Sequence, residues 1–303
     1  MILRLVSLGS VIVDLILEVP KLPDRGGDVL AAQRGMAAGG AFNVLSAAAR
    51  LGLPGLYAGP HGTGPFGDVV RGALEGERIA IARPPNSHLD TGWTLALVEP
   101  DGERTFVTVG GADAQVDAGD LSTVRYEDGD AVYVSGYDLA YPGAGGAIAE
   151  HIAGLAPGLI LVLDPGPLVA EIEAGLLAAA LGRADVLSLN KREAEAMGGV
   201  EAAMTQVRPS ATVIVRQGRD GATIHRAGSE PLAVPSVAVQ TVDTSGAGDV
   251  HVGANLAGLA RGMSWPDAVL FANRAAAYAV SRRGPAAGPT AAELEEFGAG
   301  RWM

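Results

Sequence analysis

Short runs of Val, Ile and Leu alternate along the chain with Ala-rich segments of helical periodicity. Runs such as Ile2–Leu8 and Ala131–Ser135 are apolar at nearly every position, which is typical of strands buried on both faces. Segments such as Ala144–Leu155 and Ala247–Arg261 have the spacing of helices and separate these strands. This order predicts an α/β fold, in which a central, mostly parallel sheet is flanked by helices.

Two pairs of segments interrupt this order and are typical of antiparallel hairpins. The pairs are Leu15–Val19 with Val29–Gln33, and Thr91–Val98 with Arg104–Val109. A strong turn sequence, Pro100-Asp101-Gly102, joins the second pair. We expect a small β-sheet lid formed by insertions at about residues 12–36 and 90–110. Neither a repeat nor a linker divides the chain, so we expect a single domain over residues 1–303.

Composition excludes several classes of function. The 303 residues include no Cys, which removes disulfides, thiol nucleophiles and Cys-ligated metals. Only two Lys are present and neither lies in a GK[ST] sequence, so there is no Walker A loop. The net charge of −12 argues against a broad basic face for nucleic acid. Asp14 interrupts the apolar N-terminus, and no apolar run reaches the length of about 18 residues that a membrane span needs. We therefore expect a cytoplasmic protein with neither a nucleic-acid nor a membrane partner.

The sharpest motif is Asp243-Thr244-Ser245-Gly246-Ala247-Gly248-Asp249, directly before an apolar helix. The small residues Gly246, Ala247 and Gly248 let backbone N–H groups approach an anion, and the helix start adds a positive dipole end. Such an anion hole suits a transferring phosphoryl group, and Asp249 beside it could take a proton from an attacking hydroxyl. On this pattern alone, a glycine-rich turn whose Asp caps the helix remains an equal alternative.

Five further elements follow one another in a recognisable order along the chain. They are Gly39-Gly40-Ala41-Phe42-Asn43, Asp164-Pro165, Asn190-Lys191-Arg192-Glu193, Gln217-Gly218-Arg219-Asp220-Gly221, and Ser281-Arg282-Arg283-Gly284-Pro285. Together with the glycine-rich motif, this series resembles the PfkB/ribokinase family of sugar and nucleoside kinases. The resemblance implies a ribokinase-like fold, ATP as phosphoryl donor and Mg²⁺ as cofactor.

The resemblance also implies roles for individual residues. Asp249 corresponds to the catalytic base, and Gly246, Ala247 and Gly248 to the anion hole. The implied substrate contacts are Asp14, Gly39, Gly40 and Asn43. The implied nucleotide contacts are Asn190, Glu193, Arg216, Gln217, Gly218, Gly221 and Asn273, with Glu193 acting on Mg²⁺ through water. An implied monovalent-cation site, for an ion such as K⁺, consists of Asp243, Ser245 and the backbone near Arg282 and Gly284.

Four residues in or near these motifs have simpler interpretations than a role in binding or catalysis. Asn190 and Glu193 are three apart, as in a helix N-cap with its capping-box partner. Asn273 could be an ordinary polar residue on a helix. His251, two residues after Asp249, is more typical of a packed helix residue than of a catalytic group.

A second glycine motif points to a different class of enzyme. Gly62-Thr63-Gly64-Pro65-Phe66-Gly67 has the form of a dinucleotide fingerprint, and Asp90 follows at a suitable distance. However, Pro65 removes a backbone N–H where a pyrophosphate needs donors. An NAD-dependent dehydrogenase therefore remains a minor alternative.

We predict an ATP-dependent kinase that phosphorylates a hydroxyl of a small sugar. A nucleoside kinase of the same family is the alternative, with Phe42, Trp93, Phe106 or Tyr137 covering the base. A non-catalytic sugar- or nucleotide-sensing protein on the same scaffold is a third interpretation. The intact Asp249, Asn190 and Glu193 argue against it. We expect a homodimer formed through the lid.

Overall fold

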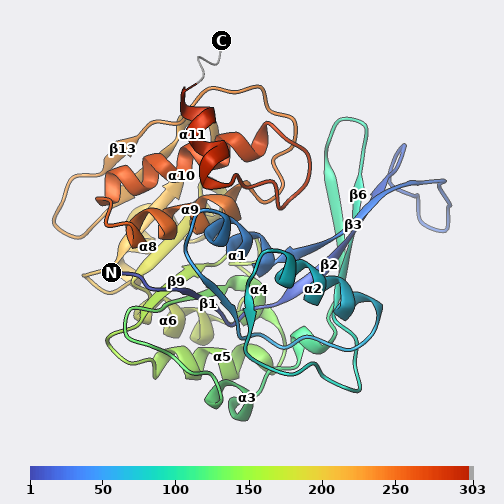
Figure 1. Cartoon of the computed structure of the whole chain (residues 1–303), viewed down its shortest axis with the longest axis horizontal. Helices are drawn as coiled ribbons and strands as arrows, with labels where there is room; N and C mark the ends of the chain where they lie inside the picture. The colour runs from blue at the N-terminus through green and yellow to red at the C-terminus, as the bar shows by residue number, and fades with distance from the viewer. Residues whose placement is uncertain (300–303) are drawn as a thin grey trace.

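The computed structural model describes residues 1–299, and its centre is a nine-stranded sheet (Figure 1). In order across the sheet the strands are β13 (Leu232–Val234), β12 (Ala222–His225), β11 (Thr212–Arg216), β10 (Val186–Asn190), β9 (Ile160–Asp164), β8 (Ala131–Ser135), β1 (Leu5–Ser7), β4 (Gly55–Tyr57) and β5 (Ala80–Ile81). The seven strands from β11 to β5 are parallel, whereas β12 pairs antiparallel with β11 and β13 pairs antiparallel with β12. The predicted α/β class and mostly parallel sheet are confirmed.

Helices cover both faces of this sheet, because successive side chains of a strand point to opposite faces. In β1, for example, Leu5 packs into one apolar cluster and Val6 into the other. The first cluster is covered by α1 (Ala41–Arg50), α2 (Pro65–Gly76), α9 (Ala247–Ala260), α10 (Trp265–Val280) and α11 (Ala291–Ala299). The second is covered by α3 (Ala118–Ser122), α4 (Gly136–Ala140), α5 (Ala144–Ala153), α6 (Ala174–Arg183), α7 (Lys191–Ala196) and α8 (Val200–Gln206).

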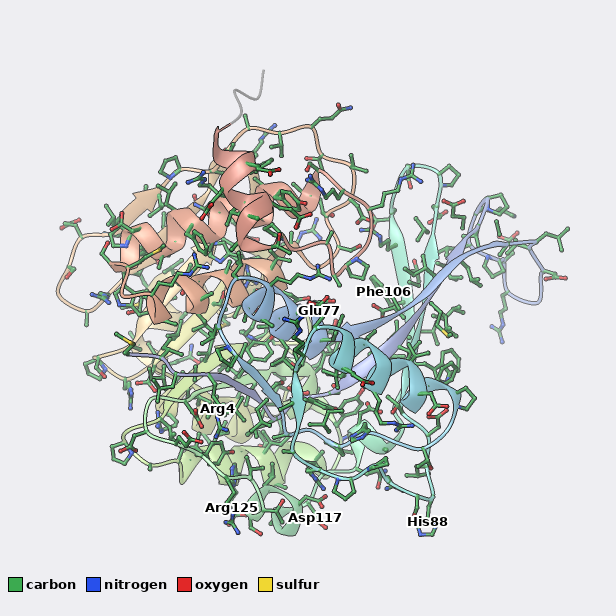
Figure 2. All side chains as sticks on the ribbon, in the orientation of Figure 1. Arg4, Glu77, His88, Phe106, Asp117 and Arg125 are labelled. Atoms are coloured by element: carbon green, nitrogen blue, oxygen red, sulfur yellow. The ribbon has the colours of Figure 1, made fainter. Side chains whose placement is uncertain are left out.

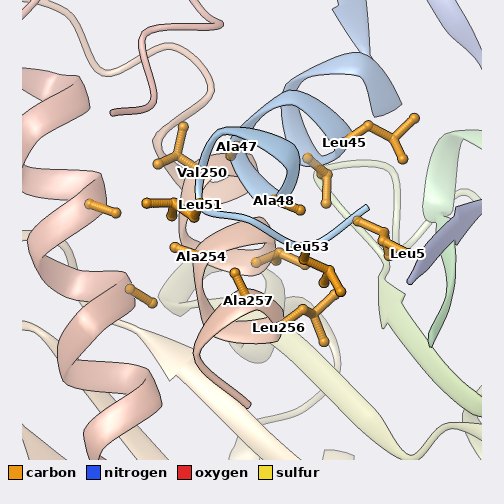
Figure 3. Close-up of a cluster of buried hydrophobic side chains, with 14 of the residues drawn as sticks. Leu5, Leu45, Ala47, Ala48, Leu51, Leu53, Val250, Ala254, Leu256 and Ala257 are labelled. Atoms are coloured by element: carbon orange, nitrogen blue, oxygen red, sulfur yellow. The ribbon is translucent and has the colours of Figure 1, made fainter. Parts of the chain in front are cut away.

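Helix α9 lies in the middle of the first cluster, between α1 and α10 (Figure 3). Its residues from Val250 to Gly258 are all buried, so it packs on every side. At Gly253, an added Cβ would lie 2.5 Å from the carbonyl oxygen of Val44 on α1. This close approach fixes the N-terminus of α9 against α1, and both helices begin at the glycine-rich motifs.

A separate four-stranded sheet projects from the body (Figure 1). Its order is β3 (Ala32–Gly40), β2 (Val11–Glu18), β6 (Trp93–Val98) and β7 (Arg104–Val109). The two predicted hairpins are present, although the first pairs Val11–Glu18 with Ala32–Gly40 and not Leu15–Val19 with Val29–Gln33. A parallel pairing of β2 with β6 joins the two hairpins. Asp14 pairs with Thr94 and Thr94 with Thr108, and the Thr94 and Thr108 hydroxyls are 2.9 Å apart. These three residues therefore share one face of the small sheet.

Helix α6 begins only at Ala174, because Asp164-Pro165-Gly166-Pro167 turns the chain after β9 and Glu173 caps the helix. Strands β12 and β13 were not predicted, since they have only four and three residues. Over residues 1–299, no helix combines the length and apolar character needed to cross a membrane. The predicted single domain, 1–303, extends into residues 300–303, which lie outside the described part.

Candidate active site

Polar side chains stand at the carboxyl ends of neighbouring parallel strands. Asp164 ends β9, Asn190 ends β10 and Arg216 ends β11. Because these strands end at the same edge of the sheet, the three residues lie side by side. Asp249, in the first turn of α9, and Asp14 on β2 of the small sheet are close enough for their charges to interact. The site therefore lies between the large sheet, α9 and the small sheet.

The first turn of α9 has the form of an anion-binding site. Gly246 caps the helix in the left-handed conformation with φ of 66°, which favours glycine. An added Cβ on Gly246 would also lie 2.1 Å from the carbonyl oxygen of Pro285. The first N–H groups of a helix have no partner inside it. Here the Ala247 N–H donates to the Thr244 carbonyl oxygen over 3.3 Å, so Gly248 and Asp249 carry the N–H groups considered for an anion. The structure thus places the predicted anion hole beside Asp249.

Asp249 is held by a residue from the other glycine motif. Asn43 on α1 donates from Nδ2 to Oδ2 of Asp249 over 2.9 Å. Burial raises the pKa of Asp249 to about 7, although the Asn43 hydrogen bond opposes this shift. The carboxyl group therefore exchanges its proton near neutral pH, as a general base must.

The predicted substrate residues are grouped around the same carboxylate. Burial raises the pKa of Asp14 to about 6. A Cβ on Gly39 would lie 2.2 Å from Oδ2 of Asp14, so only glycine leaves room for this carboxylate. Gly40, with φ of 62°, ends β3 and turns the chain into α1, which carries Asn43. The buried Oδ1 of Asn43 has no hydrogen-bond partner among the described residues, which leaves an acceptor for a hydroxyl group.

Arg216 is the positive centre of the site. Its Nη1 donates to Asp164 over 2.6 Å and to the Ser188 hydroxyl over 2.6 Å, and its Nη2 to Glu193 over 3.3 Å. Burial would lower the pKa of Arg216, but Asp164 and Glu193 outweigh this effect and raise it. A Cβ on Gly248 would lie only 3.4 Å from the guanidinium carbon, so Arg216 borders the anion hole.

Asn190 and Glu193 form the predicted capping box at the start of α7. Oδ1 of Asn190 accepts from the Glu193 N–H over 2.9 Å, and Oε2 of Glu193 accepts from the Asn190 N–H over 2.6 Å. Burial and the charge of Asp164 raise the pKa of Glu193 to about 7, against the effect of Arg216. The capping interpretation is therefore correct, and the same pair also faces the charged centre of the site.

The remaining predicted nucleotide contacts divide into two groups. Gln217 and Gly218 form the turn after β11, where Gly218 has a positive φ and open space around it. Gly221, in contrast, is buried, and an added Cβ would lie 2.1 Å from the Val234 carbonyl oxygen. Its glycine is needed for packing against β13.

The side chain of Asn273, the last of the predicted nucleotide contacts, is occupied by other parts of the chain. Asn273 is 4% exposed, and its Nδ2 donates to the carbonyl oxygens of Val234 and Pro235. Its Oδ1 lies 3.2 Å from Nε2 of His251. The side chain is therefore occupied in joining α10 to β13 and α9. His251 is likewise a packed helix residue, and burial lowers its pKa to about 3.

Comparison with known proteins agrees with this arrangement. A family model described as "pfkB family carbohydrate kinase" matches residues 3–292. An uncharacterized sugar kinase of Escherichia coli (strain K12), YegV, is 36% identical over 94% of this chain and 91% of its own length. This chain belongs to the pfkB family of carbohydrate kinases. Its members are ATP-dependent phosphotransferases, so the predicted class of enzyme is confirmed.

Solved structures show the same fold. Ribokinase from Thermotoga maritima is 24% identical, with a TM-score of 0.81 over 98% of this chain and 100% of its own. Fructokinase from Vibrio cholerae O395, solved with fructose, ADP and calcium ion bound, is 27% identical. Its TM-score is 0.77 over 97% of this chain and 99% of its own. These two structures confirm the predicted ribokinase-like fold.

The dinucleotide-like motif Gly62–Gly67 of this pfkB kinase binds a side chain of the protein itself. The N–H groups of Phe66 and Gly67, at the start of α2, donate to Asp90 over 3.1 and 2.8 Å. A carboxylate therefore already occupies the place that a pyrophosphate would take in a dinucleotide site. The structure gives the dehydrogenase alternative no support.

Two residues of the site were missed from the sequence. Asp164 was recognised only as part of a sequence element, and its pairing with Arg216 spans 52 residues. Arg104 of the lid pairs with Asp243 over 2.5 Å across 139 residues. Neither pairing has a local sequence signal, since both depend on the tertiary fold.

Proposed function

We propose that this kinase transfers the γ-phosphoryl group of ATP to a hydroxyl of a small sugar, with Asp249 as catalytic base. The observation that carries the proposal is the hydrogen bond between Asn43 and Asp249. It joins the proposed substrate side, formed by Asp14, Gly39 and Asn43, to the anion hole at the start of α9. A hydroxyl held by Asp14 and Asn43 is thus presented to both the base and the phosphoryl group.

The residues act mainly by positioning and electrostatics. Asp249 accepts the proton of the attacking hydroxyl, and its pKa near 7 makes the ionised form available at neutral pH. The N–H groups after Gly246 and the Arg216 guanidinium stabilise the negative charge of the transferring group. The turn at Gln217 and Gly218 lies on the nucleotide side.

Mg²⁺ fits the acidic edge of this site. No cluster of three or more His, Asp or Glu side chains in residues 1–299 could hold a metal alone. Mg²⁺ commonly keeps several waters and binds substrate phosphates, so one or two protein oxygens suffice. Glu193, with Asn190 beside it, would hold the ion through water, and the ion would neutralise phosphate charge.

The choice between a sugar and a nucleoside depends on the lid. Phe106 on β7 lies on the same face as Asp14 and is 58% exposed (Figure 2). Trp93 lies on the opposite face and packs against Phe66 of α2, with ring centres 6.2 Å apart. On the lid, Phe106 is therefore the aromatic residue on the side of Asp14, where it can cover the apolar face of a sugar ring. The fructose-bound relative also favours a sugar.

Acceptor-dependent ADP release tests this proposal. Purified protein with Mg-ATP is assayed against pentoses, hexoses, sugar acids, sugar phosphates and nucleosides. We expect a response to a sugar. A response restricted to nucleosides would favour the nucleoside kinase, and a folded protein that binds ATP but responds to nothing would favour a sensor.

Replacing Asp14 by Asn should weaken substrate binding. The amide keeps the shape but loses a charged acceptor of sugar hydroxyls, so we expect KM for the sugar to rise at least about tenfold. KM for ATP should stay within about twofold, because Asp14 faces the acceptor. Steady-state kinetics on both substrates check this, and a change confined to KM for ATP would contradict the assignment.

A homodimer through the lid is part of the proposal. Met36, Leu15, Leu95 and Val107 form one apolar row across the four strands, on the face opposite Asp14. Met36 and Val107 are about half exposed. Such a face is typically covered by a partner, and a second copy offers a matching face. Since the reaction consumes ATP, we place the enzyme in the cytoplasm.

Sedimentation velocity tests the dimer. The protein should sediment with twice the chain mass, and Val107→Glu should shift it to the chain mass without loss of folding. A monomeric wild-type protein at micromolar concentration would contradict this interface.

A further inference from the structure

An ion pair joins the lid to the glycine-rich loop. Nη2 of Arg104, on β7, donates to Oδ1 of Asp243 over 2.5 Å. The side chains are 21% and 11% exposed, so the pair is largely screened from solvent. Asp243 begins the motif that ends in the anion hole and Asp249. The contact therefore joins the small sheet directly to the loop before α9.

The register of the small sheet puts Arg104 on the side of the active site. Arg104 pairs with Val98 of β6, which pairs with Glu18 of β2. Glu18 is four residues after Asp14, and alternate residues of a strand share a face. Arg104 and Asp14 thus belong to the same lid face, so this face carries both the ion pair and the proposed substrate contact.

The surroundings of Asp243 are unlike those of a cation site. Oδ1 of Asp243 also accepts from the Ser245 N–H over 2.9 Å, and Oδ2 accepts from the Gly284 N–H over 3.1 Å. Both oxygens of Asp243 therefore already accept hydrogen bonds, from the Ser245 and Gly284 N–H groups and from Arg104. The Arg282 side chain, which is itself a cation, stacks on Tyr278.

The charge of Asp243 is already balanced in this arrangement. Burial alone would raise the pKa of Asp243, but the Ser245 and Gly284 N–H groups and Arg104 outweigh it and lower the pKa. A monovalent cation beside Asp243 would have to displace the guanidinium. The residues present do not fit the predicted K⁺ site.

We propose that Arg104 takes the place of a monovalent cation beside Asp243, so that the closed lid itself supplies the charge that holds the anion-hole loop. This inference rests on the proposed kinase activity. It makes Arg104 a positioning residue, which acts through Asp243 and not on the substrate. Phosphoryl transfer then needs a closed lid but no added K⁺, and an open lid leaves Asp243 without its partner.

The test compares salts at constant ionic strength. ADP formation is measured in KCl, NaCl and tetramethylammonium chloride for the wild type, Arg104→Ala and Arg104→Lys. The matched control is Lys21→Ala, which removes an exposed lid cation paired only with Asp24 among the described contacts. Melting temperatures in the same salts provide a readout that does not depend on catalysis.

We expect wild-type activity to vary less than about twofold among the salts. Arg104→Ala should retain about a tenth or less of kcat in tetramethylammonium chloride and recover at least about fivefold in KCl. KCl should raise its melting temperature but not that of the wild type. Arg104→Lys and Lys21→Ala should behave like the wild type.

Two results would overturn the inference. One is a wild-type enzyme that KCl stimulates tenfold or more. The other is an Arg104→Ala variant whose activity and melting temperature show no specific response to K⁺. If no acceptor gives ADP even with wild-type protein, the proposed function fails, while the melting temperatures still decide the role of Arg104.

Discussion

Replacing Asp249 by Asn is expected to lower kcat about a thousandfold, because the amide cannot accept the proton of the attacking hydroxyl. The side chain keeps its size, and the pKa of about 7 shows that the charged form is not favoured by its surroundings. The variant should therefore fold normally and bind ATP as the wild type does. Calorimetric ATP titration and single-turnover kinetics check both points.

The control for this variant is Asp68→Asn, which changes an exposed carboxylate on α2 that pairs with Arg71. It should leave kcat within about twofold of the wild type. Turnover of Asp249→Asn within about tenfold of the wild type would rule out Asp249 as the base.

The pH dependence of the wild type follows from the same group. Because the base must be ionised, kcat/KM should fall as the pH drops below about 7. Glu193 also has a pKa of about 7, so the acid limb belongs to the pair and not to Asp249 alone.

Replacing Arg216 by Met should have the second large effect. It removes positive charge from the anion hole, so we expect kcat to fall about a hundredfold. It also leaves Asp164 and Glu193, which are 9% and 4% exposed, without their cation. Removing one partner of such a pair costs about 3 kcal/mol of stability. Denaturant unfolding and steady-state kinetics measure the two effects.

Arg216→Lys separates stability from catalysis. Lysine keeps the charge but not the planar fork that joins Asp164, Ser188 and Glu193. We expect most of the stability to return while kcat stays well below the wild-type value. A folded Arg216→Met protein with normal turnover would show that Arg216 serves only the fold.

Much of the fold could be predicted because its signals are local. Apolar runs such as Ala131–Ser135 coincide with strands, and the glycines before Ala247 mark the start of α9. The antiparallel β12 and β13 were missed because three or four residues carry too weak a pattern. The parallel pairing of β2 with β6 was missed because it joins hairpins far apart in the sequence.

The candidate site, too, was predictable where its signals are local and not where they depend on the tertiary fold. The motifs indicated Asp249, Asn43, Asn190 and Glu193, and the structure brings these residues to one edge of the sheet. The sequence could not show that Asn43 holds Asp249, or that Arg216 pairs with Asp164, since these partners are 206 and 52 residues apart. The sequence also does not reveal that the backbone carbonyls of Val234 and Pro235 occupy the amide of Asn273.

The most direct measurement follows the γ-phosphoryl group itself. ATP labelled at the γ-phosphate is incubated with Mg²⁺, a panel of small sugars and either the wild type or Asp249→Asn, and the labelled products are separated. We expect a labelled sugar phosphate with the wild type and almost none with the variant. Label found only in inorganic phosphate, or equal amounts of sugar phosphate from both proteins, would contradict it.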